Sequence, residues 1–241
     1  MSITVCTVSG KGGTGKSTVS SGIAIAAASK NQRVLLIDLD AGLGCLDIIF
    51  GIDDEVVFRL DDAICAEDIS KALYNAKYYE NISVIPAPGK ADAIDFQKLS
   101  ALVERIKNLY DLIILDFPAG TDFEAYSRFD NAVFLIVTGA DDVSVKAAAA
   151  ISSGLKADIK ARLIINRFDM DMMTAGFYNN IDGVIDASNT RLIGIVPADG
   201  ELLLLSRNHK IKQKGRPFRA FDRIIRRISG EDVSLPVFKK I

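Results

Sequence analysis

The residues best suited to do chemistry lie in one glycine-rich stretch, Ser9 to Thr18, which follows a short run of apolar residues. Its letters fit the spacing G-x-x-x-x-G-K-[ST] of a phosphate-binding loop, with Lys16 and Ser17 in the last two positions. Glycine lets the backbone curl until several N–H groups face phosphate oxygens. Lys16 would bring positive charge to the β- and γ-phosphates, and the Ser17 hydroxyl would ligate the accompanying Mg²⁺. The stretch therefore predicts a nucleotide-phosphate site, and the alternative is a glycine-rich turn without a ligand.

Such a loop binds phosphates only between a strand and a helix. The apolar run Ile3–Val8 predicts the strand, and the alanine- and isoleucine-rich segment Val19–Ser29 predicts the helix. Free N–H groups and the dipole at the start of that helix would add to the site. The residues predicted to contact the phosphates are Gly10, Lys11, Gly12, Gly13, Thr14, Gly15, Lys16, Ser17 and Thr18.

A second lysine, Lys11, stands directly after Gly10, where an ordinary loop of this kind has no use for one. With it, the segment Lys11–Thr18 resembles the deviant Walker A motif of the MinD/ParA family of ATPases. In that family the extra lysine crosses a dimer interface to the nucleotide of the other subunit. The resemblance therefore implies ATP as ligand and an ATP-dependent sandwich homodimer, and the alternative for Lys11 is a solvated loop charge.

Two further apolar runs end in aspartate. Arg33–Asp38 and Asp111–Asp116 predict parallel strands covered on both faces, and ligands of open α/β sheets bind at the carboxyl ends of such strands. By resemblance, Asp38 helps to hold the hydration shell of Mg²⁺, Asp116 is the Walker B acid, and Asp40 positions the water that attacks the γ-phosphate. The predicted metal-site residues are Ser17, Asp38 and Asp116, and the predicted catalytic residues are Lys11, Lys16 and Asp40. The alternative is that these aspartates cap the elements that follow.

Two segments resemble the switch regions of the family but depart from its usual residues. Ala41–Asp47 resembles switch I, with Gly44 and Cys45 where MinD proteins usually carry Arg-Asn. Phe117–Gly120 resembles switch II and begins with a phenylalanine instead of a small or polar residue. The first departure leaves open whether the usual activating partner is recognised.

The adenine site is expected further along the chain. Asn166, after the predicted strand Lys160–Ile165, coincides with the family's adenine-contacting asparagine. Pro197 to Asp199, after the predicted strand Arg191–Val196, matches the second base-contacting segment and contributes Pro197 and Asp199. An asparagine at a strand end is otherwise a common turn residue.

Strands and helices alternate regularly along the chain, as they do in α/β folds. We expect a doubly wound, mostly parallel sheet of the MinD/ParA (SIMIBI) type of P-loop NTPase, with one domain over residues 1–232 and a short tail over 233–241. Further expected elements are two short helices in Arg59–Leu73, a strand Asn81–Pro86, a helix with core-facing Phe96, Leu99, Leu102, Val103, Ile106 and Leu109, a strand Asn131–Val137, a helix Val143–Gly154, a helix from Glu201 and an amphipathic C-terminal helix.

The net charge of −2 over 241 residues conceals an asymmetry. From Arg207 onward there are eleven Lys or Arg against three acids, so residues 1–206 carry about −10. The basic end is a candidate for an anionic partner. MinD proteins carry a membrane-targeting helix where this chain has Leu235–Ile241, which is too short to bury much apolar area in a bilayer surface.

The sequence favours a cytoplasmic protein, because it shows neither an apolar run of about 20 residues nor a leader with a basic start. Its three cysteines form no C-x-x-C pair, which counts against an iron–sulfur carrier. The resemblance implies a Mg²⁺-dependent ATPase that works as a positional switch in cell division or subcellular positioning, with hydrolysis stimulated by an unidentified activator. Peripheral attachment at the inner face of the cell membrane is left open. The alternatives are a flagellar-number regulator and a ParA-like partition ATPase that binds DNA through its basic end.

Overall fold

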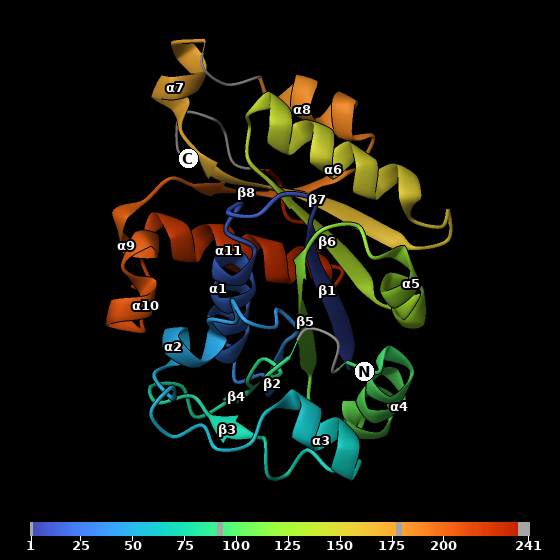
Figure 1. Cartoon of the computed structure of the whole chain (residues 1–241). Helices are drawn as coiled ribbons and strands as arrows, with labels where there is room; N and C mark the ends of the chain where they lie inside the picture. Colours follow the sequence, from blue (N-terminus) through green and yellow to red (C-terminus); the bar gives the residue numbers. More distant parts are fainter. Residues whose placement is uncertain (1, 91–93, 177–179, 236–241) are drawn as a thin grey trace.

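The structure, a computed structural model, describes residues 2–90, 94–176 and 180–235 (Figure 1). In this part of the chain eight strands form one sheet in the order β3-β4-β2-β5-β1-β6-β7-β8. Its neighbouring strands are parallel except β3, which pairs antiparallel with β4. The strands are β1 (Ile3–Ser9), β2 (Val34–Asp38), β3 (Tyr74–Asn75), β4 (Ile82–Ile85), β5 (Leu112–Ala119), β6 (Val133–Thr138), β7 (Lys160–Phe168) and β8 (Leu192–Pro197). The expected mostly parallel α/β fold is confirmed.

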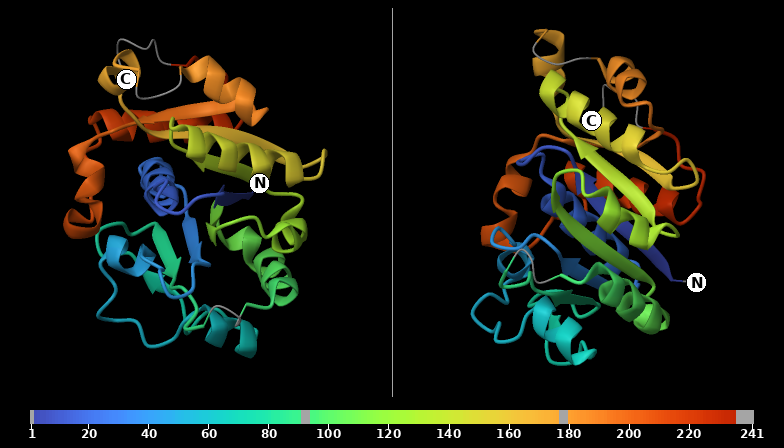
Figure 2. Two further views of the ribbon diagram at one scale, coloured as in Figure 1. Left: turned by 45° about the horizontal axis from the view of Figure 1, so that its top comes forward. Right: turned by 45° about the vertical axis from the view of Figure 1, so that its right-hand side comes forward.

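Helices cover both faces of the sheet, as the two views of Figure 2 show for α1 (blue) and α11 (red) on one side and α6 on the other. The first face is covered by α1 (Lys16–Ala28), α2 (Leu46–Phe50), α10 (Leu205–Asn208) and α11 (Arg216–Ile228). The second is covered by α3 (Leu60–Ala66), α4 (Phe96–Ile106), α5 (Phe123–Tyr126), α6 (Asp142–Gly154) and α8 (Ile181–Ser188). Short elements at the rim are α7 (Met170–Thr174), α9 (Gly200–Leu203) and the 3₁₀ turns η2 (Lys107–Leu109) and η3 (Ser127–Phe129).

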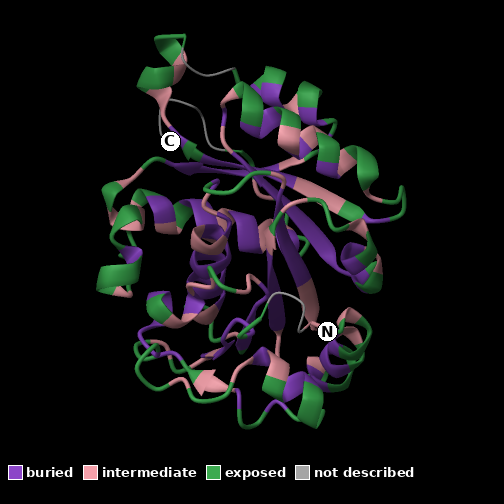
Figure 3. Cartoon of the chain, in the orientation of Figure 1, coloured by how far each residue is buried: buried purple, intermediate pink, exposed green. Residues whose placement is uncertain are grey.

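Most residues of the central strands β1, β2, β5 and β6 are buried (Figure 3), and only the first two residues of β1 and the last two of β5 are partly or fully exposed. Every residue of β2 and β6 is buried, as continuous apolar runs require when both faces of a sheet are covered. Alternate residues point to opposite faces, so Leu35 belongs to one apolar core and Leu36 to the other. The two cores hold the carboxyl ends of β1, β2 and β5 at one edge of the sheet.

The helix that follows the phosphate loop is held against α11 by a close approach. A Cβ on Gly22 of α1 would lie 2.2 Å from the ring of Phe221, so only glycine fits at this crossing. In the apolar stripe predicted for α11, Phe221, Ile224, Ile225 and Ile228 are buried, and Phe218 is half-buried against the same core. Packing against α11 therefore fixes the position of α1 under the loop.

Several expected element bounds are wrong. Helix α1 begins at Lys16, three residues before the expected Val19. Arg59–Leu73 contains one helix and not two, because Glu67 takes a left-handed φ of 52° and ends α3. Strand β5 runs past its expected end at Asp116 to Ala119, and β7 continues past Ile165 to Phe168.

Other differences concern the rim of the fold. The expected helix from Glu201 is divided into α9 and α10 at Leu204. Leu109 was expected in the core but is 58% exposed, because α4 ends at Ile106 and Leu109 lies in the 3₁₀ turn that follows. Strand β3 and helix α8 were not expected. The predicted division into a domain over 1–232 and a tail over 233–241 stays a prediction, since residues 236–241 lie outside the described residues.

No helix in the described part of the chain is long and apolar enough to cross a membrane.

Candidate nucleotide site

The glycine-rich loop joins the end of β1 to the start of α1 at the carboxyl edge of the sheet. Gly13 and Gly15 adopt left-handed φ values of 78° and 82°, which glycine tolerates best. A Cβ on Gly15 would also lie 2.3 Å from Nδ2 of Asn166. That same Nδ2 donates a hydrogen bond of 2.7 Å to the Thr14 carbonyl. This hydrogen bond joins residues that are 152 positions apart in the sequence. The predicted loop and the predicted Asn166 are therefore parts of one site.

Lys16 pairs with a carboxylate of β5. Its Nζ is 3.6 Å from Oδ1 of Asp116, and both side chains are buried. The Ser20 hydroxyl, one turn further along α1, donates a hydrogen bond of 2.9 Å to the same oxygen. Among the described residues, Oδ2 of Asp116 has no hydrogen-bond partner. Burial raises the pKa of Asp116, while the charge of Lys16 and the hydroxyls of Ser17 and Ser20 oppose this rise.

Asp38 stands opposite Asp116 in the register of β2 and β5. Its Oδ1 accepts a hydrogen bond from the Asp40 N–H (3.0 Å), and its Oδ2 accepts from the N–H groups of Cys45 (3.0 Å) and Leu46 (3.1 Å). Asp38 therefore holds both ends of the predicted switch I segment. Burial, followed by the charge of Asp116, raises the pKa of Asp38 to about 7 although these hydrogen bonds oppose the rise.

The predicted catalytic Asp40 is half-buried just beyond β2. The segment after it is open to solvent, with the Leu43 side chain 82% exposed. Cys45 is half-buried, and burial raises the pKa of its thiol to about 11. The segment is thus fixed by Asp38 at its ends and free of the core in its middle.

Phe117, the unusual first residue of the predicted switch II, belongs to the core. It is 1% exposed, and its ring lies 5.1 Å from that of Tyr126 and 5.9 Å from those of Phe96 and Phe129, centroid to centroid. These aromatic contacts stabilise the strand beyond Asp116. They explain why β5 continues past its expected end at Asp116.

Lys11 is placed at the rim of the loop. Its Nζ lies 3.4 Å from Oδ1 of Asp141, with both side chains a little under half exposed. Asp141 caps α6 by accepting from the backbone N–H (3.0 Å) and the hydroxyl (2.6 Å) of Ser144. Burial acts to raise the pKa of Asp141, but the hydrogen bonds from Ser144 and Lys11 outweigh it and lower that pKa.

The base-contact residues divide into two groups. Oδ1 of Asn166 is buried and has no hydrogen-bond partner among the described residues, so it can accept from a ligand. Pro197 pairs with Phe168 at the same edge of the sheet. Asp199 is already engaged, because it caps α9 through the Glu201 N–H (3.0 Å) and pairs with Arg216 at 3.4 Å.

A cavity of about 190 Å³ lies beside the loop. Its walls come from the loop, from Gly139 to Asp141, and from Asn166 and Arg167. Gly12 and Gly13 are exposed, and a Cβ added to either would have no atom within 4 Å. A Cβ added to Gly10 would lie 2.6 Å from the carbonyl oxygen of Ala147. Thr14 is buried and Thr18 half-buried. The predicted residues lie along this edge of the sheet, and Asp199 among them is already paired with Arg216.

Sequence reasoning missed Ser20, Asp141, Ser144 and Arg167. Ser20 could have been found, since it follows Lys16 by one helical turn and so shares its face. Asp141 and Ser144 form an N-cap pattern, but nothing in that pattern points to Lys11.

Comparisons with known proteins agree with this geometry. Residues 5–211 match the CobQ/CobB/MinD/ParA nucleotide binding domain. The chain is 33% identical to the septum site-determining protein MinD of Synechocystis over 95% of this chain and 90% of that protein. It is 30% identical to the protein of the same name from Helicobacter pylori over 99% and 95%. A chain of the MinC:MinD cell division protein complex of Aquifex aeolicus has a similar structure, with a TM-score of 0.87 and 29% identity over 98% of this chain and 99% of that one.

Proposed function

Because the chain belongs to the CobQ/CobB/MinD/ParA family of nucleotide-binding domains, we propose that it is a MinD-like, Mg²⁺-dependent ATPase acting in cell division. Full-length similarity to septum site-determining proteins supports the process. The observation that carries the chemistry is the convergence of Lys16, Asp38 and Asp116 at the carboxyl edge, beside a loop in which Gly13 and Gly15 have left-handed φ values.

Phosphate binding falls to the loop. Its backbone N–H groups and the start of α1 bind the anionic oxygens, and Lys16 supplies the positive charge. Asp116 holds the Lys16 ammonium in place, and Ser20 holds Asp116. Lys16 is therefore oriented before any nucleotide arrives, which lowers the entropy cost of binding.

A divalent cation fits beside this lysine. Asp38 and Asp116 are neighbouring buried carboxylates with raised pKa values, and Oδ2 of Asp116 lacks a partner among the described residues. The described residues contain no group of three or more His, Cys, Asp or Glu side chains that could hold a metal by itself. Ser17 would therefore share Mg²⁺ with the phosphates and water, and the ion would neutralise phosphate charge there.

Hydrolysis is assigned to Asp40. Its carboxylate stands just outside the strand that ends at Asp38, where the Asp38–Asp40 hydrogen bond fixes its backbone. From there it orients the attacking water, since phosphoryl transfer asks the protein mainly for positioning and charge stabilisation. Oδ1 of Asn166 accepts from the exocyclic amine of adenine, which would favour ATP over GTP.

The proposed cycle includes an ATP-dependent homodimer in which Lys11 reaches the nucleotide of the other subunit. Exposed apolar side chains at the same edge support a contact there: Leu43 is 82%, Leu203 73% and Val143 63% exposed. A protein activator would stimulate hydrolysis, and the similar Aquifex aeolicus chain belongs to a complex with a partner, MinC. Dimers would act as a positional switch that hydrolysis resets, with peripheral attachment to an anionic membrane.

The proposal is tested by ATP binding and turnover in three variants. Lys16→Ala should lose ATP binding because the phosphate counter-charge is gone. Asp40→Ala should keep binding and lose at least about tenfold in turnover, since only the water is mispositioned. Asp54→Ala, an exposed acid away from the loop, is the matched control and should behave as the parent. Parental hydrolysis by Asp40→Ala would refute the role given to Asp40.

A further inference from the structure

A second cavity lies at the opposite edge of the sheet from the nucleotide site. It measures about 590 Å³ and is lined by the first residues of three strands, Val133 of β6, Lys160 of β7 and Leu192 of β8. Its other wall is the end of α11 and the segment 230–235. Because the phosphate loop follows the carboxyl end of β1 and these strands are parallel, the two sites do not overlap.

The cavity is lined by more positive than negative side chains. Lys160, Arg162, Arg191 and Arg227 contribute to it, against Glu231 and Asp232. Glu231 already forms an ion pair with Arg226, whose Nε lies 2.7 Å from Oε2 of Glu231. Arg226 itself does not line the cavity. None of the four cations forms an ion pair with a described residue. The cavity therefore has unneutralised positive charge to offer a ligand.

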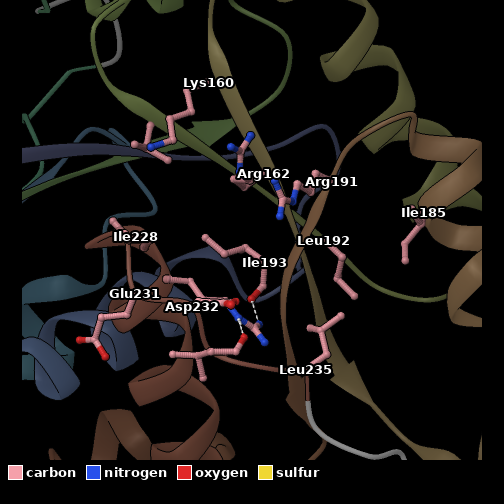
Figure 4. A pocket seen from close by; sticks show the side chains of 14 residues that line it. Lys160, Arg162, Ile185, Arg191, Leu192, Ile193, Ile228, Glu231, Asp232 and Leu235 are labelled. Carbon is pink, nitrogen blue, oxygen red and sulfur yellow. Dashed lines mark hydrogen bonds between the residues drawn. The ribbon is translucent and has the colours of Figure 1, made fainter.

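The guanidinium of Arg227 is held by two hydrogen bonds, and its third nitrogen has no hydrogen-bond partner among the described residues. Its Nε donates to the Val233 carbonyl at 2.7 Å, and its Nη1 donates to the carbonyl of Ile193 (Figure 4, dashed lines). Nη2 is buried without a hydrogen-bond partner among the described residues. Burial lowers the pKa of Arg227 and the charge of Arg223 lowers it further, while the charge of Asp232 opposes this fall. A buried, unsatisfied guanidinium donor costs free energy that an anion would recover.

The remaining wall is apolar. Ile185 of α8, Leu192 and Ile193 of β8, and Leu235 face the same space as the cations. Figure 4 shows Lys160, Arg162 and Arg191 in the upper part of the view and Leu192 and Leu235 below them. A volume of this size is typical of small-molecule sites, which combine apolar walls with a few fixed polar groups.

We propose that this cavity binds a small amphipathic anion, with a phosphate or carboxylate head on Arg162, Arg191 and Arg227 and an apolar body against Leu192 and Ile193. A bare inorganic anion would leave the apolar wall in water, and an uncharged apolar molecule would leave Nη2 of Arg227 unsatisfied. The site lies outside the nucleotide machinery and is independent of the function proposed above.

Titration calorimetry with decyl phosphate, below its micelle concentration, tests the proposal. One molecule should bind per chain, and inorganic phosphate and decanol should each bind at least about tenfold more weakly, because each offers only half of the ligand. Binding by Lys16→Ala should equal that of the parent protein. Loss of ATP binding in that variant, with decyl phosphate binding intact, separates this site from the nucleotide site.

Side-chain variants locate the head group. Arg162→Gln and Arg191→Gln should each weaken decyl phosphate binding roughly five- to tenfold, through loss of a charge-assisted hydrogen bond. These positions are chosen over Arg227, whose bonds to two backbone carbonyls also hold the fold together. Arg219→Gln, an exposed cation of α11 outside the cavity, is the control and should bind as the parent does.

Methyl NMR supplies the readout for the apolar wall. Decyl phosphate should shift the methyl resonances of Ile185 and Ile193 and leave that of Ile49, in the other half of the molecule, in place. Decanol binding as tightly as decyl phosphate, unchanged affinity in both arginine variants, or unshifted Ile185 and Ile193 methyls would each overturn the proposal.

Discussion

Lys11 Nζ lies 3.4 Å from Oδ1 of Asp141, an ion pair that joins the phosphate loop to the N-terminus of α6 across 130 residues of sequence. If Lys11 serves the nucleotide of a second subunit, it has to leave this partner first. The pair is close to half exposed, so solvent screens it and its rupture costs only about 0.2–1 kcal/mol. The contact therefore favours the monomer by a small amount.

Removing the charge of Asp141 should strengthen dimerisation. Asp141→Asn keeps an N-cap for α6, because asparagine accepts the Ser144 N–H as well as aspartate does. In an Asp40→Ala background with ATP, the dimer should form at roughly two- to fivefold lower protein concentration, measured by light scattering. Asp142→Asn, the neighbouring acid, is the matched control. Weaker dimerisation of Asp141→Asn would mean that Asp141 itself contributes to the interface.

Lys11→Ala tests the dimer itself. In the Asp40→Ala background, which blocks hydrolysis, the parent should be monomeric with ADP and dimeric with ATP. Lys11→Ala should remain monomeric with ATP although nucleotide still binds through Lys16. Lys156→Ala changes an exposed lysine just beyond the far end of α6, and this variant should dimerise as the parent does. If Lys11→Ala forms the ATP-dependent dimer normally, the sandwich arrangement is unsupported.

The raised pKa of Asp38 predicts how the free energy of unfolding depends on pH in the protein without nucleotide and Mg²⁺. Its pKa is raised to about 7, above that of an unfolded aspartate near 3.9, so the folded state binds the extra proton between these values. The free energy of unfolding should therefore be highest at the acidic end of this window and fall as pH rises toward 7. Chemical denaturation in EDTA from pH 5 to pH 7.5 measures the slope.

Asp38→Asn is the variant that isolates this effect. It removes the titrating group, so the slope over the same window should flatten, whatever the change in absolute stability from lost backbone hydrogen bonds. Adding ATP with Mg²⁺ to the parent should flatten the slope as well, because a cation favours the ionised carboxylate. An unchanged slope in Asp38→Asn would assign the pH dependence to another group, of which buried Asp116 is the nearest.

The sequence predicted the parts of the site that follow from strand ends. Continuous apolar runs place Asp38 and Asp116 at the carboxyl edge, and parallel pairing then sets them opposite each other. The Lys11–Asp141 pair could not be predicted, because it depends on how α6 is placed beside the loop. The strand beyond Asp116 was missed because its signal, Phe117, is a tertiary one: three aromatic rings that meet only in the folded core.

The cavity at the opposite edge of the sheet could not be predicted from the sequence either. Its cations are far apart in the sequence: Lys160 and Arg162 lie on β7, Arg191 just before β8 and Arg227 on α11. Each looks like an ordinary surface residue in the sequence. The surplus of positive charge after residue 206 could be counted in the sequence, but the sequence did not show which of these side chains form ion pairs. Arg216 pairs with Asp199, and Arg226 pairs with Asp222 and Glu231. Fewer free charges therefore remain for an anionic partner than the composition indicates.

The last prediction concerns this basic end. Lys212, Lys214 and Arg219 are exposed and form no ion pair with a described residue. Residues 236–241 of the predicted tail over 233–241 lie outside the described residues. So few charges bind a monomer weakly to an acidic lipid surface, but two copies on one dimer raise the affinity through effective concentration. We therefore expect binding to anionic vesicles with ATP and little with ADP, lost at high salt because salt screens exposed charge.

Co-sedimentation with vesicles that contain phosphatidylglycerol measures this binding, with neutral vesicles and duplex DNA as parallel arms. Deleting Val237–Ile241 should weaken vesicle binding by removing two lysines and three apolar side chains per subunit. Lys212→Gln with Lys214→Gln should weaken it as well, and Lys156→Gln should not. Unchanged binding after the deletion would show that the tail is no anchor. ATP-dependent binding to duplex DNA without vesicle binding would favour a partition ATPase, because phosphates attract the same lysines whether a lipid or a nucleic acid presents them.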